Sequence, residues 1–272
     1  MMTQKIPYWH VDAFSDRPFG GNQAAVMVLD EWLPDDVLVK IGAENNFAET
    51  AFVVRDASGA ADWELRWCTP TYEIALCGHA TLASGHVLLT RDAEGQAMDR
   101  VTFRTRQSGI LEVVRDGDGY ELALPAIPCA PDTAARQAEA IALLGAAPVE
   151  FARSELGYNI YLFENAAAVR ALAPDIRGLE RLGSDQFICT APGDATDIVS
   201  RVFVPGGGVD EDSVTGSAHA ALTPFWAQKL GRTQFTAHQA SIRGGDLTLR
   251  LAGDRAWLGG PCVTVVEGSF YL

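Results

Sequence analysis

Short runs of hydrophobic residues, with turn residues between them, occur along most of the chain and predict β-strands. These runs are rich in β-branched or aromatic residues, which favour strands. The sequence DGDG at 116–119 predicts a hairpin turn, because glycine tolerates the positive φ that such turns need. The predicted strands are residues 8–14, 24–29, 50–55, 63–68, 101–105, 110–115, 120–124, 158–163, 186–190, 198–204, 247–251, 256–258 and 263–266.

Three segments have patterns typical of ordinary amphipathic helices. Residues 35–43 begin with two acidic residues, which favour a helix N-terminus. Residues 132–144 precede Gly145, and glycine commonly ends a helix. Residues 165–173 precede Pro174, which cannot continue the helix. We therefore predict helices in these three segments.

Two further predicted helices, residues 78–91 and 216–230, are small and apolar on nearly every side. A helix without a polar face is buried all round. Pro224 interrupts the second helix and is expected to kink it, because proline lacks the N–H group and clashes with the preceding turn.

The two apolar helices follow the same series of residue types: Arg-x3-Pro, a glutamate, then a small residue followed by Gly, a polar residue and Ala. The first copy has Arg66, Pro70, Glu73 and CGHA at 77–80; the second has Arg201, Pro205, Glu211 and TGSA at 215–218. Such a repeat predicts two similar α+β halves, each with a curved sheet around one buried helix. The alternative is chance similarity between two helices rich in alanine and glycine.

The proline-rich segment 125–131 (PAIPCAP) resembles a linker near the middle of the chain. We therefore expect an N-terminal lobe of residues 1–124, with Glu49 and the CGHA turn. Residues 125–272 would form the C-terminal lobe with the TGSA turn. As an alternative boundary, the last strand, about residues 263–272, returns to the sheet of the N-terminal lobe.

The turns that start the two apolar helices are candidate binding sites. A helix N-terminus leaves N–H groups unpaired and carries a partial positive charge, so it can bind a carboxylate. In a fold of this kind the two N-termini are expected to face one cleft. Simple capping by Ser217 and Asp212, and a buried structural His79, are the alternatives. The candidates at these turns are Gly78, His79, Asp212, Gly216 and Ser217.

Composition excludes several classes of partner. The formal net charge is −14, which disfavours nucleic acid and anionic membranes as partners. The five cysteines contain no C-x-x-C pair, so a disulfide framework is not expected. No apolar run is long enough to span a bilayer, and the N-terminus lacks the apolar core of a signal peptide. We therefore expect a cytoplasmic protein.

Other enzyme classes lack their motifs in this sequence. The five histidines show neither H-E-x-x-H nor H-x-H spacing, so no metal site is predicted. The segment 215–219 (TGSAH) does not match the G-x-S-x-G motif of serine hydrolases. The segment 205–210 (PGGGVD) does not match the G-x-G-x-x-G motif of dinucleotide enzymes, and no cofactor is expected.

Four stretches together resemble the PhzF-like family of phenazine biosynthesis, which has the diaminopimelate-epimerase fold. They follow the family's order and span most of the chain. They are VDAF at 11–14 with FGGNQA at 19–24, NNFAETAF at 45–52, CTP at 68–70 with Glu73 and LCGHATLA at 76–83, and GVDEDSVTGSA at 208–218.

The resemblance implies a cofactor-independent isomerase with two pseudo-symmetric lobes, expected as a homodimer acting on a small carboxylate substrate. Glu49 matches the family's proton-transferring glutamate, and His79, Asp212 and Ser217 match its other site residues. The founding activity isomerises dihydro-hydroxyanthranilic acid by moving a proton along its ring. The alternatives are a member that binds a small molecule or a protein without catalysis, and a one-base epimerase or racemase.

Two positions depart from related patterns. Ser213 replaces the proline that usually follows the family's aspartate, so the loop that carries Asp212 is expected to be less rigid. Epimerases of this fold use one cysteine from each half, whereas this chain has Cys77 and Thr215 at those positions. A two-thiol racemase is therefore not expected, and Cys77 is interpreted as a small packing residue.

The predicted mechanism is a proton shuttle by one carboxylate. Glu49 lies between two apolar pairs, Phe47-Ala48 and Ala51-Phe52, and partial burial makes a carboxylate a stronger base. Without the family pattern, the favoured interpretation of Glu49 is a surface residue beside a strand. Glu49 is assigned the carbon-bound proton, His79 and Asp212 the polarising hydrogen bonds, and Ser217 with the Gly78 and Gly216 backbones the substrate carboxylate.

Overall fold

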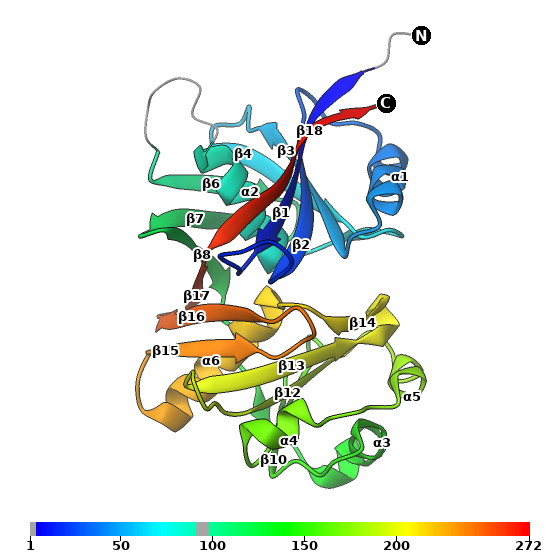
Figure 1. Cartoon of the computed structure of the whole chain (residues 1–272), viewed down its shortest axis with the longest axis vertical. Helices are drawn as coiled ribbons and strands as arrows, with labels where there is room; N and C mark the ends of the chain where they lie inside the picture. The colour runs from blue at the N-terminus through cyan, green and yellow to red at the C-terminus, as the bar shows by residue number, and fades with distance from the viewer. Residues whose placement is uncertain (1–3, 91–97) are drawn as a thin grey trace. The chain divides into compact units, whose positions relative to one another are not determined.

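The computed structural model describes residues 4–90 and 98–272, with only the backbone of residues 134–136 (Figure 1). The chain divides into two compact units, Met1–Leu124 with Gly259–Leu272, and Pro125–Leu258. We call these units the first lobe and the second lobe. None of the helices within the described residues has the length and apolar character required to cross a membrane.

The first lobe is a curved, mainly antiparallel sheet. Strand β1 pairs antiparallel with β2 and β18; β2 runs parallel to β3; β4 lies between antiparallel β3 and parallel β6; and β7 joins β6 to β8. The bounds are β1 (Lys5–Ala13), β2 (Asn22–Val28), α1 (Asp35–Asn45), β3 (Glu49–Arg55), β4 (Trp63–Cys68), β5 (Glu73–Ile74), α2 (Gly78–Thr90), β6 (Arg100–Thr105), β7 (Ile110–Asp116), β8 (Gly119–Pro125) and β18 (Cys262–Tyr271).

The second lobe has the same kind of sheet with more helices around it. Strand β11 runs parallel to β12, and β13 lies between antiparallel β12 and parallel β15. The bounds are β9 (Ala130–Pro131), α3 (Ala134–Leu144), β10 (Glu150–Arg153), β11 (Tyr158–Leu162), α4 (Ala166–Arg170), α5 (Ile176–Glu180), β12 (Gln186–Pro192), β13 (Ile198–Val204), a 3₁₀ turn (Pro205–Gly207), β14 (Val209–Asp212), α6 (Gly216–Leu230), β15 (Gln234–Gln239), β16 (Gly245–Ala252) and β17 (Arg255–Gly260).

The predicted repeat is present in the order of strand pairing. In the first lobe, β2 and β3 are parallel, β4 pairs with β3 and β5, and α2 leads to β6, which is parallel to β4. In the second lobe, β11, β12, β13, β14, α6 and β15 follow the same sequence of pairings. The fold of two pseudo-symmetric lobes, each built around one helix, is therefore confirmed.

The repeated arginine and glutamate form the same ion pair in both lobes. Arg66 donates from Nε and Nη2 to the two carboxylate oxygens of Glu73, at 2.9 and 2.6 Å. Arg201 donates from the same two nitrogens to Glu211, at 2.7 and 2.9 Å. Such two-point pairs fix geometry as well as charge. Each pair joins β4 or β13 to the short strand that precedes the central helix.

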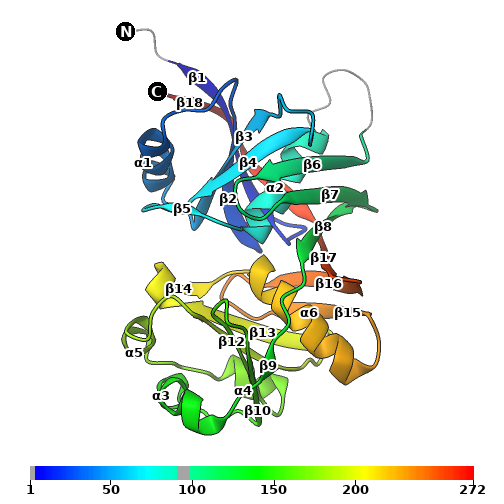
Figure 2. The same cartoon turned by 180° about the vertical axis from the view of Figure 1, so that it is seen from behind.

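The central helices are buried as their composition predicts. Helix α2 contacts β1, β2, β3, β6, β7 and β18, so the sheet surrounds it (Figures 1 and 2). Gly85 of α2 packs against β7, where an added Cβ would lie 2.4 Å from Cγ1 of Val113. Helix α6 contacts β11 and β16 within the second lobe. Gly85 therefore lets α2 approach its sheet closely.

The remaining helices cover the other face of each sheet. Leu38 and Ile41 of α1 pack with Phe52 in the first lobe. Leu144 of α3 and Leu179 of α5 pack in a cluster with Phe187 of β12 in the second lobe. Figure 2 shows α3 and α4 on the side of the second sheet opposite α6. Each lobe therefore has apolar cores on both faces of its sheet.

Pro224 lies within α6, and the structure shows how its missing N–H is accommodated. Proline cannot bond the carbonyl four residues earlier, which here belongs to Ala220. The N–H of Ile127 donates to this carbonyl at 3.1 Å. The proline-rich segment 125–131 therefore supplies the hydrogen bond that the helix lacks.

The predicted elements agree closely with the observed ones, with a few differences. The strands at 63–68 and 198–204 and the helix at 216–230 have the predicted bounds, whereas the helix predicted at 165–173 is only Ala166–Arg170. Residue 91, the predicted end of α2, lies outside the described residues. The prediction omitted α5, β5, β9, β10, β14 and β15.

Candidate active site

Glu49 is positioned by the turn between α1 and β3. Asn46 ends α1 in the left-handed conformation, with φ of 51°, which asparagine tolerates better than most residues. Glu49 is then the first residue of β3, paired in register with Ala24 of β2. Its side chain is 14% exposed. The carboxylate therefore lies at the end of the sheet and is largely buried.

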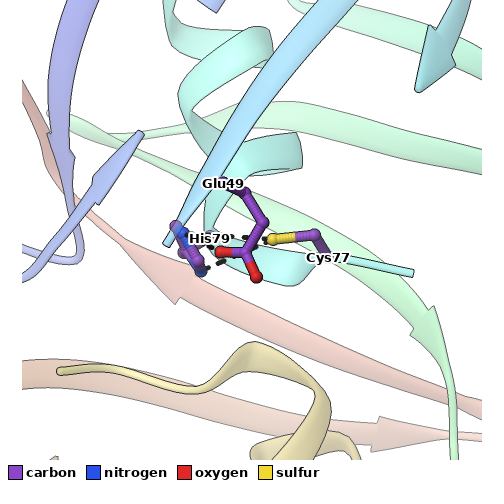
Figure 3. A group of neighbouring side chains, drawn as sticks. All are labelled: Glu49, Cys77 and His79. Carbon is purple, nitrogen blue, oxygen red and sulfur yellow. Dashed lines mark hydrogen bonds and ion pairs between the residues drawn. The ribbon is translucent and has the colours of Figure 1, made fainter. Parts of the chain in front are cut away.

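His79 is the second residue of α2, and its side chain is 4% exposed. Its Nε2 lies 3.1 Å from Oε2 of Glu49, as Figure 3 shows. Its Nδ1 lies 3.1 Å from Nδ2 of Asn22. Glu49 Oε2 is itself buried, and among the described residues its close polar neighbour is this imidazole. The sequence therefore folds Glu49 and His79 into one polar pair inside the first lobe.

The ion pair changes the proton affinity of His79. Burial alone would lower the pKa of this imidazole, but the neighbouring Cys77 sulfur and Glu49 carboxylate outweigh burial and raise its pKa well above the ordinary value. The negative charge of Glu49 therefore favours the protonated form of this imidazole, and the two side chains form an ion pair at 3.1 Å.

Cys77 lies next to this pair, with Sγ 3.5 Å from Nδ1 of His79 (Figure 3). Burial, with the Glu49 charge as a second cause, raises the pKa of the thiol to about 11. A thiol with this pKa is protonated at neutral pH and is a poor base. Cys77 therefore lacks the thiolate character that a thiol-based epimerase requires.

The second-lobe residues surround the N-terminus of α6. Gly216 is the first residue of this helix, and Ser217 Oγ accepts a hydrogen bond from Nε2 of Gln186 at 3.1 Å. Asp212 ends β14, and its backbone carbonyl accepts a hydrogen bond from Nε2 of Gln239 at 2.7 Å. Asp212, Gly216 and Ser217 therefore belong to one turn of the second lobe.

The loop at Ser213 is held although it lacks the family's proline. Ser241 donates from Oγ to the carbonyl of Ser213 at 2.8 Å. Gln239, which is fully buried, bonds the backbone on both sides of Ser213, at the Asp212 carbonyl and at the Thr215 N–H. Hydrogen bonds from the neighbouring strand and turn therefore restrain the backbone that carries Asp212.

The repeat assigns each site residue of the first lobe a counterpart in the second lobe. Strand register aligns Thr50 with Cys68 and Phe187 with Phe203, so the residue that corresponds to Glu49 is Gln186. His79 and Ser217 are each the second residue of a central helix. The two side chains of each pair lie 3.1 Å apart, as an ion pair in the first lobe and as a hydrogen bond in the second. The second lobe therefore repeats the arrangement with uncharged groups.

Two polar residues of these arrangements were not singled out from the sequence. Asn22, which lies against His79, is the last residue of the FGGN segment. Gln186 would have emerged had the repeat been extended backwards from Arg201 through the preceding strand. Its Oε1 atom is buried and has no hydrogen-bond partner among the described residues.

Three potential metal ligands also meet in the first lobe. Donor atoms of Glu49, Cys77 and His79 all lie within 4.8 Å of one another. The spacing of histidines along the sequence did not reveal this cluster, because its glutamate comes from β3 and its other members from the start of α2.

Known proteins resemble the chain over nearly its whole length. The family model described as phenazine biosynthesis-like protein matches residues 11–268. An uncharacterized isomerase of Pseudomonas aeruginosa is 44% identical over 268 residues, covering 98% of this chain and 99% of that protein. A human phenazine biosynthesis-like domain-containing protein is 36% identical and covers 97% of this chain and 99% of its own length.

Solved structures agree with these matches. A PhzF-family protein of Enterococcus faecalis superposes with a TM-score of 0.89 at 37% identity, covering 99% of this chain and all of that one. A predicted epimerase of Pseudomonas aeruginosa, 18% identical over 97% of this chain and 99% of that one, shares the fold with a TM-score of 0.73. Because the family match and the relatives extend across almost the entire sequence, this chain belongs to the phenazine biosynthesis-like (PhzF) family of isomerases.

Proposed function

We propose that this protein is a cofactor-independent isomerase in which Glu49 moves a proton between two carbons of a small carboxylate substrate. The contact between Glu49 Oε2 and His79 Nε2, at 3.1 Å, is the observation that carries the proposal. It pairs a largely buried carboxylate with an imidazole of raised pKa at the start of a buried helix. This combination supplies a base and the group that holds it in place.

The proposed reaction has two proton transfers. Glu49 takes a proton from one carbon, and the electron pair of that C–H bond is delocalised toward the unsaturated part of the substrate. The double bond shifts as Glu49 returns the proton to a second carbon on the same face. His79 keeps its own proton and holds the Glu49 side chain in position; between the two transfers Glu49 is a neutral carboxylic acid and the substrate carries the delocalised negative charge.

The second lobe is proposed to bind the substrate carboxylate. The N–H groups at the start of α6 and the Ser217 hydroxyl supply uncharged hydrogen-bond donors and a favourable helix dipole. Asp212 is proposed to polarise the substrate by a hydrogen bond, and the Gly78 backbone at the start of α2 is proposed to add a donor. We propose that the functional unit is a homodimer, as the family resemblance implies.

A two-base racemase is the less favoured alternative. The position in the second lobe that corresponds to Glu49 holds Gln186, whose amide cannot accept a proton at neutral pH. Thr215 stands where the second cysteine of a two-thiol epimerase would be. These residues therefore support one proton-transferring group rather than two.

The decisive experiment follows solvent deuterium into carbon. The protein is incubated in D₂O with a panel of small unsaturated carboxylic acids, and carbon-bound deuterium is measured by NMR. Wild type is expected to incorporate deuterium, and Glu49→Gln to lose about 10²- to 10⁴-fold of the rate, the usual contribution of a general base.

The control is Glu44→Gln, because Glu44 is an exposed carboxylate on α1 only a few residues away. It is expected to retain the wild-type rate. Binding of the same acids, measured by ligand-observed NMR, separates the two classes of function. Binding without deuterium uptake in wild type would indicate a non-catalytic member of the family, and equal rates in wild type and Glu49→Gln would refute the role of Glu49.

A further inference from the structure

The second lobe contains a cavity of about 200 Å³, lined by residues of α3 and of the sheet. Arg153 of β10, Asn159 of β11 and Phe187 of β12 lie opposite one another in strand register, so they share one face of the sheet. Gln186, one residue before Phe187, points to the other face and bonds Ser217 of α6. The cavity therefore lies on the face of the sheet away from α6, apart from the candidate active site.

Three polar side chains of the cavity wall are almost completely buried and are held by hydrogen bonds. Tyr161, which is 1% exposed, donates from its hydroxyl to Oε1 of Gln137 at 2.7 Å. Asn159, which is 4% exposed, donates from Nδ2 to Oδ2 of Asp185 at 3.0 Å. These bonds connect α3, β11 and the segment before β12. The polar groups of the wall are therefore fixed in place before a ligand binds.

Arg153 is the group of this wall that lacks a partner. Its Nε atom is buried and has no hydrogen-bond partner among the atoms that the structure describes. Its guanidinium forms no ion pair with a carboxylate in residues 4–90 and 98–272, although Glu139 and Asp185 line the same cavity. Buried donors are normally bonded, because an unmade hydrogen bond is costly. The cavity therefore offers Arg153 to an acceptor that comes from outside the chain.

The charges of the wall favour a ligand that carries both signs. The guanidinium of Arg153 suits a carboxylate, whose two oxygens match its planar donors. The carboxylates of Asp185 and Glu139 can accept hydrogen bonds from an ammonium group, and they repel phosphates and other multiply charged anions. A zwitterion satisfies both kinds of group, whereas a simple carboxylate leaves the two acids without a cation.

The size and the apolar wall of the cavity restrict the ligand further. Ala140, Leu182 and Phe187 provide an apolar surface beside the charged groups. A cavity of about 150 Å³ accommodates benzene, which has six non-hydrogen atoms, so a volume of about 200 Å³ accommodates about eight. This is the size of valine, and the apolar surface suits its aliphatic side chain.

We infer that this cavity binds one free α-amino acid with a small aliphatic side chain, of about the size of valine. The ligand carboxylate accepts from Nε of Arg153, and its ammonium group donates to Asp185. Its side chain packs against Leu182 and Phe187. Binding is non-covalent, and it is independent of the proposed isomerase because no residue of the cavity wall belongs to the candidate active site.

The experiment is isothermal titration calorimetry of the full chain with L-valine and with its two halves. One half is 3-methylbutanoate, which lacks the ammonium group, and the other is isobutylamine, which lacks the carboxylate. Wild type is expected to bind one valine per chain and each half more than tenfold more weakly. Arg153→Met and Asp185→Asn are expected to lose more than tenfold in affinity for valine, because each removes a charge-assisted hydrogen bond.

Two exposed residues of the second lobe provide matched controls. Arg177→Met and Asp194→Asn remove the same charges outside the cavity wall and are expected to keep the wild-type affinity. Leu182→Trp fills the cavity without changing its charge and is expected to abolish binding. Circular dichroism establishes that each variant is folded, and this third variant tests the site even if a charge variant fails to fold.

The inference is overturned if wild type shows no saturable binding of valine, which would leave water as the partner of Arg153. It is also overturned if 3-methylbutanoate binds as tightly as valine, or if the charge variants bind valine as wild type does. Ser217→Ala is expected to retain valine binding, and its loss would place the ligand at the start of α6 instead. Arg153→Met is expected to retain the deuterium uptake of wild type, so the two proposals succeed or fail separately.

Discussion

At the scale of single residues, the chemistry of the first lobe depends on three side chains from three elements. Asn22 from β2, Glu49 from β3 and His79 from α2 form one chain of contacts, each at 3.1 Å. Asn22 sets the orientation of the imidazole, and the imidazole holds the carboxylate. Replacing any one of them would leave a buried polar group of its neighbour with a poorer partner.

His79 gives the stability of the protein a defined pH dependence. Its pKa is raised in the folded state, so its contribution is fully present below the unfolded value of about 6.5 and is lost as pH rises through the folded pKa. The loss of unfolding free energy in His79→Gln, relative to wild type, is therefore expected to be largest near pH 6 and to shrink toward pH 9. Urea unfolding followed by tryptophan fluorescence at several pH values measures this difference.

His238→Gln is the control for this prediction. His238 pairs with the exposed carboxylate of Asp246 at 2.8 Å. Exposed pairs contribute little, so its effect is expected to stay below about 0.5 kcal/mol across the same range. A His79→Gln deficit that stays constant or grows from pH 6 to pH 9 would contradict the assignment.

At the scale of elements, each lobe depends on a central helix made of small residues. Helix α2 is buried at most of its positions and contacts six of the strands around it. Gly85 is the clearest case, because it packs against the side chain of Val113. Helix α6 contains Pro224, which cannot donate a hydrogen bond to the carbonyl of Ala220. The N–H of Ile127 donates to this carbonyl instead.

Gly85→Ala tests this close approach. Alanine would normally stabilise a helix by about 1 kcal/mol relative to glycine. Here the new Cβ would lie 2.4 Å from Cγ1 and 2.7 Å from Cβ of Val113, so the strand must shift. Overpacking of this kind costs about 1 to 3 kcal/mol, and we expect it to outweigh the helix preference.

Thermal and urea unfolding of Gly85→Ala measure the net change. The control is Gly268→Ala, because nothing lies within 4 Å of a Cβ at that position. Gly268→Ala is expected to change the unfolding free energy by less than about 0.5 kcal/mol. A Gly85→Ala protein more stable than wild type would show that α2 has room that the structure does not predict.

At the scale of the whole molecule, the chain is a duplicated lobe in which structure is kept and chemistry has diverged. Both lobes retain the two-point ion pair between an arginine and a glutamate. Among the described residues, an acid, a histidine and a thiol come together at the start of the central helix in the first lobe alone. The ion pairs therefore belong to the shared architecture, whereas the proposed chemistry belongs to one half.

Arg66→Met and Arg201→Met test the shared role of the ion pairs. Arg66 is 3% exposed and Glu73 is 20% exposed, so removing the arginine leaves this largely buried carboxylate with the half-exposed Arg106, 3.0 Å away, in place of a buried two-point partner. Breaking such a pair is expected to cost about 3 kcal/mol. A loss of similar size is expected for Arg201→Met, measured by urea unfolding.

The control for these variants is Lys40→Met, which removes the exposed pair with Asp36. Its effect is expected to remain below about 0.5 kcal/mol. If neither arginine variant loses more stability than Lys40→Met, the repeated ion pairs do not stabilise the lobes in which they lie.

Much of the fold was predictable because strands and buried helices have strong local patterns. The helix at 216–230 and the strands at 63–68 and 198–204 were predicted to the residue. Strand β15 was missed because its pattern includes the polar residues Gln234, His238 and Gln239. Helix α5 was missed because five residues are too few to establish a helical period.

The candidate site was predictable only in part. The repeat and the family pattern identified Glu49 and His79 as candidates, and the structure places them in contact. Asn22 and Gln186 were not identified as site residues. Their hydrogen-bonding partners are distant along the chain, and such contacts do not affect the local periodicity of the sequence. Asp212, Gly216 and Ser217 remain predicted site residues of the second lobe.

The sequence by itself determined where strands and helices form, that the chain contains a repeat, and to which family its motifs point. These properties follow from local periodicity, turn residues and short motifs. Only the tertiary structure decided that Glu49, Cys77 and His79 meet, since β3 and the start of α2 are brought together by strand pairing and packing rather than by proximity along the chain. It likewise decided that Gln186 is the uncharged counterpart of Glu49, because that equivalence is set by strand register.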